Sequence, residues 1–312
     1  MTLAIATDAQ KKQRDRLTHA AWGQRLSLAE FRSREEQLRD HPWAREAMTT
    51  WFSIDEHGEP LASCETFRMR SVRQVDGGHI EGSTYAIASV YTEEALRGRG
   101  HARAMIEEVC TALQAKDPQA QSAILFSEVG ASLYRRAGFR ERPWRERLFA
   151  AEKGELPNGV ALLGEAELAQ ALDALPLPDE PFVVWPTALQ LDWHLERERA
   201  YARLMDRQRP KAVGATCGDA TLLWAGDLKN GRLSVLVGCS PDPDDSKRLI
   251  RAAAAVAWNA GLNAVHVWEM PSIHLAGGEG FALDADDLPM VRPFTPDLAA
   301  QDWKSIPRAL WV

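Results

Sequence analysis

The feature that most constrains this chain is a strand that runs into a glycine-rich turn and then into a helix. Residues 85–91 are small or β-forming, and the turn Arg97-Gly-Arg-Gly-His-Ala follows them. After the turn, apolar residues recur at helical spacing, namely Ala102, Met105, Ile106, Val109 and Leu113. Gly98 and Gly100 permit a tight turn whose backbone N–H groups, with the positive end of the helix, attract an anion. The pattern therefore predicts an α/β domain that binds a phosphate or pyrophosphate group at this turn.

Other phosphate-binding turns fit this sequence less well. A dinucleotide-binding turn has the pattern G-x-G-x-x-G, but Arg103 stands where the third glycine is required. A nucleoside triphosphate loop needs Gly-Lys-Ser or Gly-Lys-Thr, which the sequence lacks. Taken alone, the turn is also compatible with a plain connection between a strand and a helix.

Composition excludes several classes of protein. The length of 312 residues suggests two domains of ordinary size, each able to bury its own core. The net charge is −7 and no run of Lys and Arg is interleaved with aromatic residues, so we predict no nucleic-acid partner. The four cysteines have no metal-ligand spacing, so we predict neither a metal site nor a disulfide framework. No apolar run is long enough to cross a bilayer and the first residues do not form a secretory signal, so we predict a cytoplasmic protein without a membrane partner.

The order of predicted elements places the turn in a first domain, residues 1–150. Helices are expected between residues 8 and 45, where Ser27-Leu-Ala-Glu forms a capping box. Strands are expected at 48–54, at 61–72 and in the segment that ends at Tyr91. The helix after the turn is expected to extend to about residue 116, followed by a strand at 122–126, a helix at 130–137 and a strand from residue 139.

Two further regions follow this domain. Residues 151–186 contain several prolines and are predicted to be a connector with one short helix. A second domain, residues 187–312, is predicted to contain a helix at 188–207, a hairpin at 221–237, a helix at 244–259 and a strand at 264–268. The last part of the chain, from residue 270, is rich in Pro and Asp and is expected to be a tail over the core.

A second motif, Ser127-Glu-Val-Gly-Ala-Ser-Leu-Tyr-Arg-Arg-Ala-Gly-Phe139, stands downstream of the turn. Together the two motifs resemble the signatures of the GCN5-related N-acetyltransferases (GNATs), R/Q-x-x-G-x-G/A and N-x-x-A-x-x-L-Y-x-x-x-G-F. With Leu61-Ala-Ser-Cys-Glu-Thr66 they are most similar to the fungal lysine acetyltransferase group of that superfamily. The sequence departs from the pattern at Ser127, where Asn is usual, and at Phe139, where the group often has Trp. The similarity covers most of the chain, but it is firm over residues 60–140 and thin after residue 186.

The resemblance implies a fold and a reaction. It implies an α/β (α+β layers) GNAT fold with a mixed central sheet, and a second, degenerate GNAT-like α/β domain without a cofactor loop. The implied activity is direct transfer of an acetyl group from acetyl-CoA to a small primary amine in a ternary complex, with the side-chain amine of free lysine favoured. Acetylation of a protein lysine, of a polyamine or of an aminoglycoside is an alternative, and so is a non-catalytic acyl-CoA sensor. The oligomeric state is left open.

The predicted site follows from these motifs. The cofactor is expected to contact the backbone of Val90, Tyr91 and Thr92 as an added strand, and the turn formed by Arg97, Gly98, Arg99, Gly100, His101 and Ala102. The amide of Val90 is the candidate donor to the thioester oxygen. No metal is expected to take part.

Three side chains are expected to act on the acceptor side or in proton transfer. Tyr134 is the general acid that the resemblance implies, although a tyrosine that is only packed against the core is the alternative. Glu65 is the candidate general base, directly or through water, because burial on a strand raises the pKa of a carboxyl group. Glu81 and Glu128 are the alternatives for that role, and Ser127 and Glu128 are predicted to bind the acceptor amine.

Overall fold

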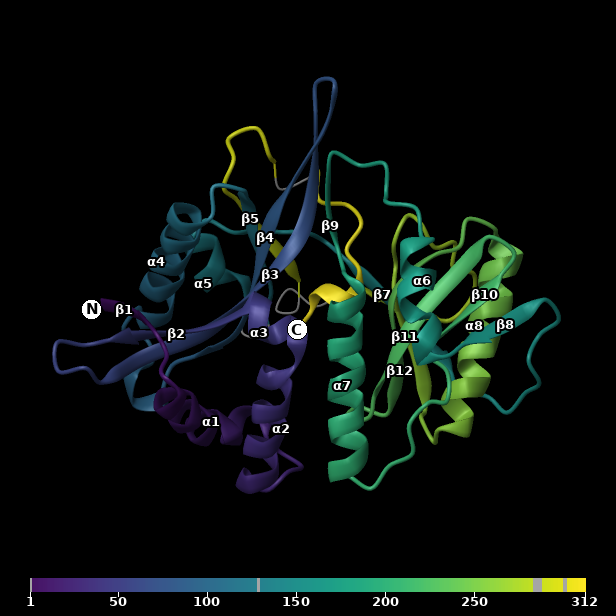
Figure 1. The fold of residues 1–312 in the computed structure, drawn as a ribbon, viewed down its shortest axis with the longest axis horizontal. Helices are drawn as coiled ribbons and strands as arrows, with labels where there is room; N and C mark the ends of the chain where they lie inside the picture. The colour runs from purple at the N-terminus through teal and green to yellow at the C-terminus, as the bar shows by residue number, and fades with distance from the viewer. Residues whose placement is uncertain (1, 128–129, 283–287, 300–301) are drawn as a thin grey trace. The chain divides into compact units, whose positions relative to one another are not determined.

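The chain forms two compact units. The computed structural model describes residues 2–127, 130–282, 288–299 and 302–312. The first unit comprises residues 1–142, 284–302 and 311–312, and the second comprises residues 143–283 and 303–310 (Figure 1). Each unit has a mixed β-sheet with helices packed against it, which confirms the predicted two-domain α/β architecture.

The first unit opens with a short strand and three helices, and the meander and the phosphate turn follow. Its elements are β1 (Thr2–Ile5), α1 (Asp8–Trp22), α2 (Leu28–Asp40), α3 (Pro42–Ala47), β2 (Met48–Ile54), β3 (Pro60–Val75), β4 (Gly78–Tyr91), the 3₁₀-helix η1 (Glu94–Leu96), α4 (His101–Lys116), β5 (Ala120–Phe126), α5 (Ala131–Arg136), β6 (Arg140–Glu141) and β15 (Pro289–Pro293). The capping box predicted at Ser27 is present, because Ser27 Oγ accepts from the Glu30 amide at 3.3 Å and Glu30 Oε2 accepts from the Ser27 amide at 2.7 Å.

The sheet of the first unit has the strand order β1-β2-β3-β4-β5-β15-β6. Strands β1 to β4 pair antiparallel with their neighbours, whereas β4 and β5 pair in parallel. This change of direction requires the crossover that α4 supplies between β4 and β5. The glycine turn therefore lies at the C-terminal end of a central strand, which is the usual ligand edge of such a crossover.

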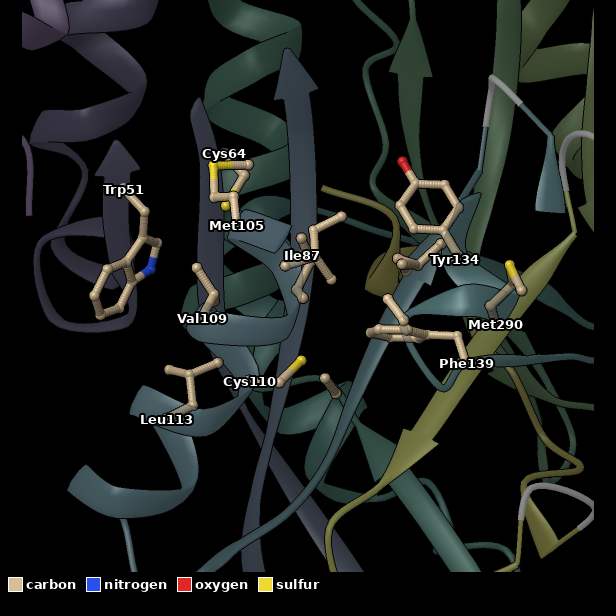
Figure 2. Packing of buried hydrophobic residues seen from close by; sticks show 14 of the residues in the cluster. Trp51, Cys64, Ile87, Met105, Val109, Cys110, Leu113, Tyr134, Phe139 and Met290 are labelled. Atoms are coloured by element: carbon tan, nitrogen blue, oxygen red, sulfur yellow. The ribbon is translucent and has the colours of Figure 1, made fainter. Parts of the chain in front are cut away.

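The core of this unit lies between α4, α5 and one face of the sheet (Figure 2). Of the apolar residues predicted to share one face of α4, Ala102 is only half-buried. The others pack against Trp51 and Cys64 of β2 and β3, namely Met105, Ile106, Val109 and Leu113. Because side chains alternate along a strand, Ser63, Glu65 and Phe67 of β3 lie on the opposite face. There Phe67 stacks on Trp43 of α3, with ring centroids 5.4 Å apart. Ser63 and Glu65 of β3 therefore face the N-terminal helices rather than α4.

The second unit has a sheet of its own with the strand order β14-β7-β13-β12-β11-β10-β8. Its elements are β7 (Arg145–Ala150), β8 (Val160–Leu163), the 3₁₀-helix η2 (Glu165–Glu167), α6 (Leu168–Asp173), β9 (Phe182–Trp185), α7 (Ala188–Leu204), β10 (Gly214–Cys217), β11 (Ala220–Asp227), β12 (Arg232–Cys239), α8 (Pro243–Asn259), β13 (Ala264–Trp268), β14 (Glu279–Ala282) and the 3₁₀-helix η4 (Arg308–Leu310). Strands β12 and β13 pair in parallel across α8, so the predicted strand-helix-strand repeat is present. In place of a glycine turn, α8 begins with a cap from Asp242 and with Pro243.

The boundaries of the two units differ from those expected from composition. Strand β7 pairs with β13, and β8 pairs with β10, so residues before 151 and residues within the expected 151–186 connector belong to the second sheet. The end of the chain is also more than a tail, because residues 289–293 form β15 between β5 and β6 of the first sheet. Prolines flank these short strands, and their partners are distant in sequence, so local patterns do not show the pairing. No helix in the described ranges is both long enough and apolar enough to span a membrane.

Candidate active site

The site begins where β4 separates from β5. The two strands pair in parallel only from Ser83 to Ala86, and the described residues of β4 beyond Ala86 have no partner on β5. The backbone of β4 up to Tyr91 therefore has an open edge on that side. An extended ligand segment can add to such an edge through main-chain hydrogen bonds. This is the place that was predicted for Val90, Tyr91 and Thr92.

A bulge in β4 lies within this open edge. Opposite Ser63 and Glu65 of β3 stand Tyr91 and Ala88, so β4 contains one residue more than β3 across the same span. Ser89 adopts a φ of 53°, which is unusual for a residue with a side chain. The bulge turns the following amides, and that of Val90 first among them, away from the regular ladder.

The glycine turn has the backbone conformation that its sequence predicts. Gly98 has a φ of 77°, and Gly100 has a φ of 85° and caps α4 in the left-handed region. A Cβ at either glycine would meet no heavy atom within 4 Å, so open space lies in front of both. No side chain caps the helix, and the first-turn N–H groups have no intrahelical acceptor. The turn can therefore hold a phosphate group with backbone donors.

Thr92 and Arg97 form the passage from the strand to the turn. Arg97 Nε donates to the Thr92 carbonyl at 3.1 Å, so that side chain braces the segment. Among the described residues, Thr92 Oγ1 is buried and has no hydrogen-bond partner. Arg97 and Arg99 are exposed, and His101 is half-buried. The charges of Arg97 and Arg99 lie at the surface of the turn, where solvent screens them.

Tyr134 is held in the core beneath the open edge. Its side chain is 5% exposed and belongs to the same apolar cluster that Val90 contacts. Gly138 has a φ of 86°, and the resulting turn brings Phe139 against Tyr134, with ring centroids 6.3 Å apart and planes at 72°. Figure 2 shows the hydroxyl end of Tyr134 pointing away from Phe139. The ring is therefore packed as a core residue, and the acid role of Tyr134 stays a prediction.

Glu65 lies on the opposite face of the sheet in a buried polar cluster. Arg14 of α1 donates from Nη1 to Glu65 Oε1 at 2.9 Å, and the two side chains are 3% and 5% exposed. Burial raises the pKa of Glu65, whereas the charge of Arg14 and a hydrogen bond from Ser89 act to lower it. The raised pKa agrees in direction with the expectation for a general base.

Aromatic side chains border this cluster. Tyr91 of β4 and Trp22 of α1 pack edge to face with ring centroids 6.0 Å apart, and the Arg14 guanidinium lies 6.0 Å from the Trp22 centroid. Sequence reasoning missed both Arg14 and Trp22. The segment 8–16 is rich in charged residues, so Arg14 resembled a solvated helix residue, and only the long-range contact with β3 shows otherwise.

Of the two residues predicted to bind the acceptor, only Ser127 lies in the part of the chain that the structure describes. Ser127 directly follows β5 and is 1% exposed. Glu128 lies outside the described residues. Glu81, the other alternative base, is instead an exposed residue of the β3–β4 hairpin that is hydrogen-bonded to Arg70. Across the described parts of both units, no group of three or more His, Cys, Asp or Glu side chains could hold a metal ion.

Comparison with known protein families gives a match in each half of the chain. Residues 15–139 match the acetyltransferase (GNAT) family, and residues 161–287 match the LYC1 GNAT-like C-terminal domain. The first match spans the bulge, the glycine turn and Tyr134. The second covers most of the second sheet.

Individual relatives agree with these matches. A lysine acetyltransferase from Yarrowia lipolytica is 23% identical over 332 residues, which covers 86% of this chain and 84% of that protein. Two solved structures share the fold along nearly the whole chain. A GCN5-related N-acetyltransferase from Kribbella flavida has a TM-score of 0.55 and 18% identity, with 93% of this chain and 70% of that chain covered. A conserved protein of unknown function from Enterococcus faecalis V583 has a TM-score of 0.60 and 13% identity, with 94% and 72% covered.

Proposed function

The chain belongs to the GNAT acetyltransferases and is an N-acetyltransferase, and we propose that it transfers the acetyl group of acetyl-CoA to the side-chain amine of free lysine. One observation carries the proposal. The open edge of β4 beyond Ala86 leads directly into a turn whose Gly100 caps α4 with a φ of 85°. A strand edge that can pair with an extended ligand segment is thus followed directly by a turn whose backbone can bind phosphates.

These residues fit acetyl-CoA, which supplies an acetyl group activated as a thioester. The amides of Gly98 to Ala102 would hold the pyrophosphate, because they lie at the positive end of α4 and open space lies in front of the glycines. The backbone of Val90 to Thr92 would bind the pantetheine arm as an added strand. Thr92 Oγ1, which is buried and unpartnered among the described residues, would hydrogen-bond to the same arm.

Glu65 would take a proton from the acceptor ammonium, directly or through water. The amine must be neutral to attack a carbonyl, and a carboxylate whose pKa is raised by burial accepts that proton more readily near neutral pH.

Val90 and Tyr134 would act on the thioester itself. Attack of the amine nitrogen on the carbonyl carbon moves an electron pair onto the oxygen, and the Val90 amide would donate a hydrogen bond to that oxygen. When the carbon–sulfur bond breaks, Tyr134 would give its phenolic proton to the thiolate of CoA, and the tyrosinate would take back the proton that the acylated nitrogen loses as it becomes an amide. Both residues contact one apolar cluster, which keeps water from the thioester. Transfer is direct, in a ternary complex, without an acyl-enzyme.

Support for lysine as the acceptor comes from the relative. The Yarrowia lipolytica protein is named a lysine acetyltransferase and aligns with most of this chain. The net charge of −7 also suits a cationic acceptor, because it raises the local concentration of an ammonium compound.

The test is an amine screen that detects free CoA thiol. Purified full-length protein would be given acetyl-CoA with lysine, ornithine, a polyamine, an aminoglycoside or a lysine-containing peptide, and each product would be analysed by mass spectrometry. We expect thiol release with free lysine and a single acetyl group on its side-chain nitrogen. Product from the peptide or the polyamine alone would assign a different acceptor. Tight acetyl-CoA binding with no release from any amine would instead identify a non-catalytic acyl-CoA sensor.

A further inference from the structure

Arg14 makes three hydrogen bonds that meet at the bulge in β4. Its Nε donates to Ser63 Oγ at 3.1 Å, its Nη1 donates to Glu65 Oε1 at 2.9 Å, and its Nη2 donates to the Ser89 carbonyl at 2.7 Å. Two of these acceptors flank the register shift on β3, and the third is the bulge residue itself. A planar guanidinium directs its N–H groups at fixed angles, so these three contacts define the position of the Ser89 carbonyl relative to β3.

Ser89 needs this support. A serine at a φ of 53° is in the left-handed region, which disfavours residues with a side chain. Arg14 holds its carbonyl, and the Ser89 side chain is hydrogen-bonded to Glu65. Arg14, Glu65 and Ser89 therefore form one interlocked group, and Arg14 is 2% exposed within it. The bulge conformation is held from the side of α1 rather than by the sheet.

We propose that Arg14 is a positioning residue for catalysis, because it fixes the bulge at Ser89 and thereby aims the Val90 amide at the thioester oxygen. This inference rests on the proposed function. Arg14 itself would touch neither substrate. It acts through the peptide between Ser89 and Val90, whose carbonyl it binds and whose N–H belongs to Val90. A rotation of that one peptide plane moves both groups together, so losing the contact to the carbonyl releases the amide.

A second arginine of the N-terminal helices, the partly buried Arg39, serves as a matched control. Arg39 of α2 makes a two-pronged contact with Asp15 of α1, at 2.8 Å and 2.5 Å, and Asp15 is fully buried. Arg39 and Arg14 thus both pair with buried carboxylates beside α1. None of the recorded hydrogen bonds of Arg39 reaches β4, so its loss should destabilise the helices without releasing the bulge.

The experiment compares Arg14→Met, Arg14→Lys and Arg39→Met in the full-length protein. We expect Arg14→Met to lower kcat about a hundredfold, as for loss of an oxyanion donor, while the Kd for acetyl-CoA stays within about twofold because the glycine turn is unchanged. Arg14→Lys should recover part of kcat at most, since an ammonium cannot make the three contacts at once. Arg39→Met should lower Tm but leave kcat per folded molecule unchanged. Each kcat is taken at the top of its own pH profile, because Arg14 also influences the ionisation of Glu65.

A double-mutant cycle with Ser89→Gly makes the test specific to the bulge. Glycine adopts the left-handed region without strain. The fold decrease in kcat caused by Arg14→Met should therefore be several times smaller in the Ser89→Gly background than in the wild-type background. The inference is overturned if Arg14→Met keeps the wild-type kcat while its Tm falls as in Arg39→Met. It is also overturned if the effects of Arg14→Met and Ser89→Gly on log kcat are additive in the double variant.

A readout that needs no turnover separates this inference from the proposed function. In ¹⁵N-labelled protein, the Val90 amide resonance should move in Arg14→Met and stay in place in Arg39→Met. A moved resonance in a protein that acetylates no amine would refute the proposed function and keep Arg14 as the residue that holds the bulge. An unmoved resonance would refute the role of Arg14, whatever the activity.

Discussion

Replacing Gly100 with alanine tests the phosphate turn with an internal control for backbone strain. Gly100 and Gly58 both have a φ of 85°, and a Cβ at either position would meet no heavy atom within 4 Å. Gly58 lies in the turn between β2 and β3 and does not cap α4. Placing alanine in the left-handed region costs about 1–2 kcal/mol at either site, so both variants should lose a similar amount of stability. Each kcal/mol corresponds to about 2–4 °C in Tm for a domain of roughly this size.

Only Gly100→Ala should affect acetyl-CoA binding. Its methyl group would occupy the space in which a phosphate approaches the first amides of α4. Losing one hydrogen bond to a charged group costs about 1.5–3 kcal/mol, which corresponds to an increase in Kd of about tenfold to a hundredfold. Calorimetric titration with CoA and thermal unfolding of both variants provide the two measurements. The reasoning fails if Gly100→Ala binds CoA as tightly as the wild-type protein, or if Gly58→Ala weakens binding to the same extent.

Three further predictions concern proton transfer and stability. Tyr134→Phe should lower kcat with little change in the Kd for acetyl-CoA, and an unchanged kcat would remove Tyr134 from the acid role. Burial raises the pKa of Glu65, so the rate should fall with decreasing pH along an acid limb above the usual glutamate range of about 4.3, and Glu65→Gln should abolish that limb and lower the rate about a hundredfold or more. An acid limb that persists unchanged in Glu65→Gln would assign the proton to another group. In the second unit, burial lowers the pKa of His194 to about 3, although its hydrogen bond to the Ala309 carbonyl opposes this. The folded state therefore disfavours protonation of His194. The resulting contribution to the free energy of unfolding is fully present above the pKa of about 6.5 that a histidine has in the unfolded chain, and about 2 kcal/mol of it should be lost as the pH falls from 7 to 5. Denaturant unfolding of His194→Gln should lack this part of the pH dependence.

Local sequence patterns predicted several helices, strands and turns in both units. The strands at 48–54 and 264–268 have the predicted bounds, and the turn places its glycines at positive φ as expected. These features depend on neighbouring residues, such as the apolar spacing of α4 and the conformational freedom of Gly98 and Gly100. The two motifs around Ser89–Ala102 and Ser127–Phe139 were therefore sufficient to predict the fold family.

Features that depend on distant contacts could not be predicted in this way. The bulge at Ser89 arises from a register shift against β3 and a contact with Arg14, and nothing in the segment around Ser89 marks it. Likewise, Arg14 differs from its exposed neighbours in α1 only by its partners on β3 and β4. The division of the chain was misplaced for the same reason, since the partners of β7, β8 and β15 are far away in sequence.

The position of β15 has a consequence for how the protein is made. The chain leaves the first unit after residue 142, builds the second, and returns to place residues 289–293 beside β5. During synthesis on the ribosome, the edge of β5 that pairs with β15 therefore stays unpaired until the second unit has been synthesised. A fragment ending near residue 142 would expose that edge permanently and should self-associate. The first sheet is therefore completed only by residues 289–293, which follow the second unit in the chain.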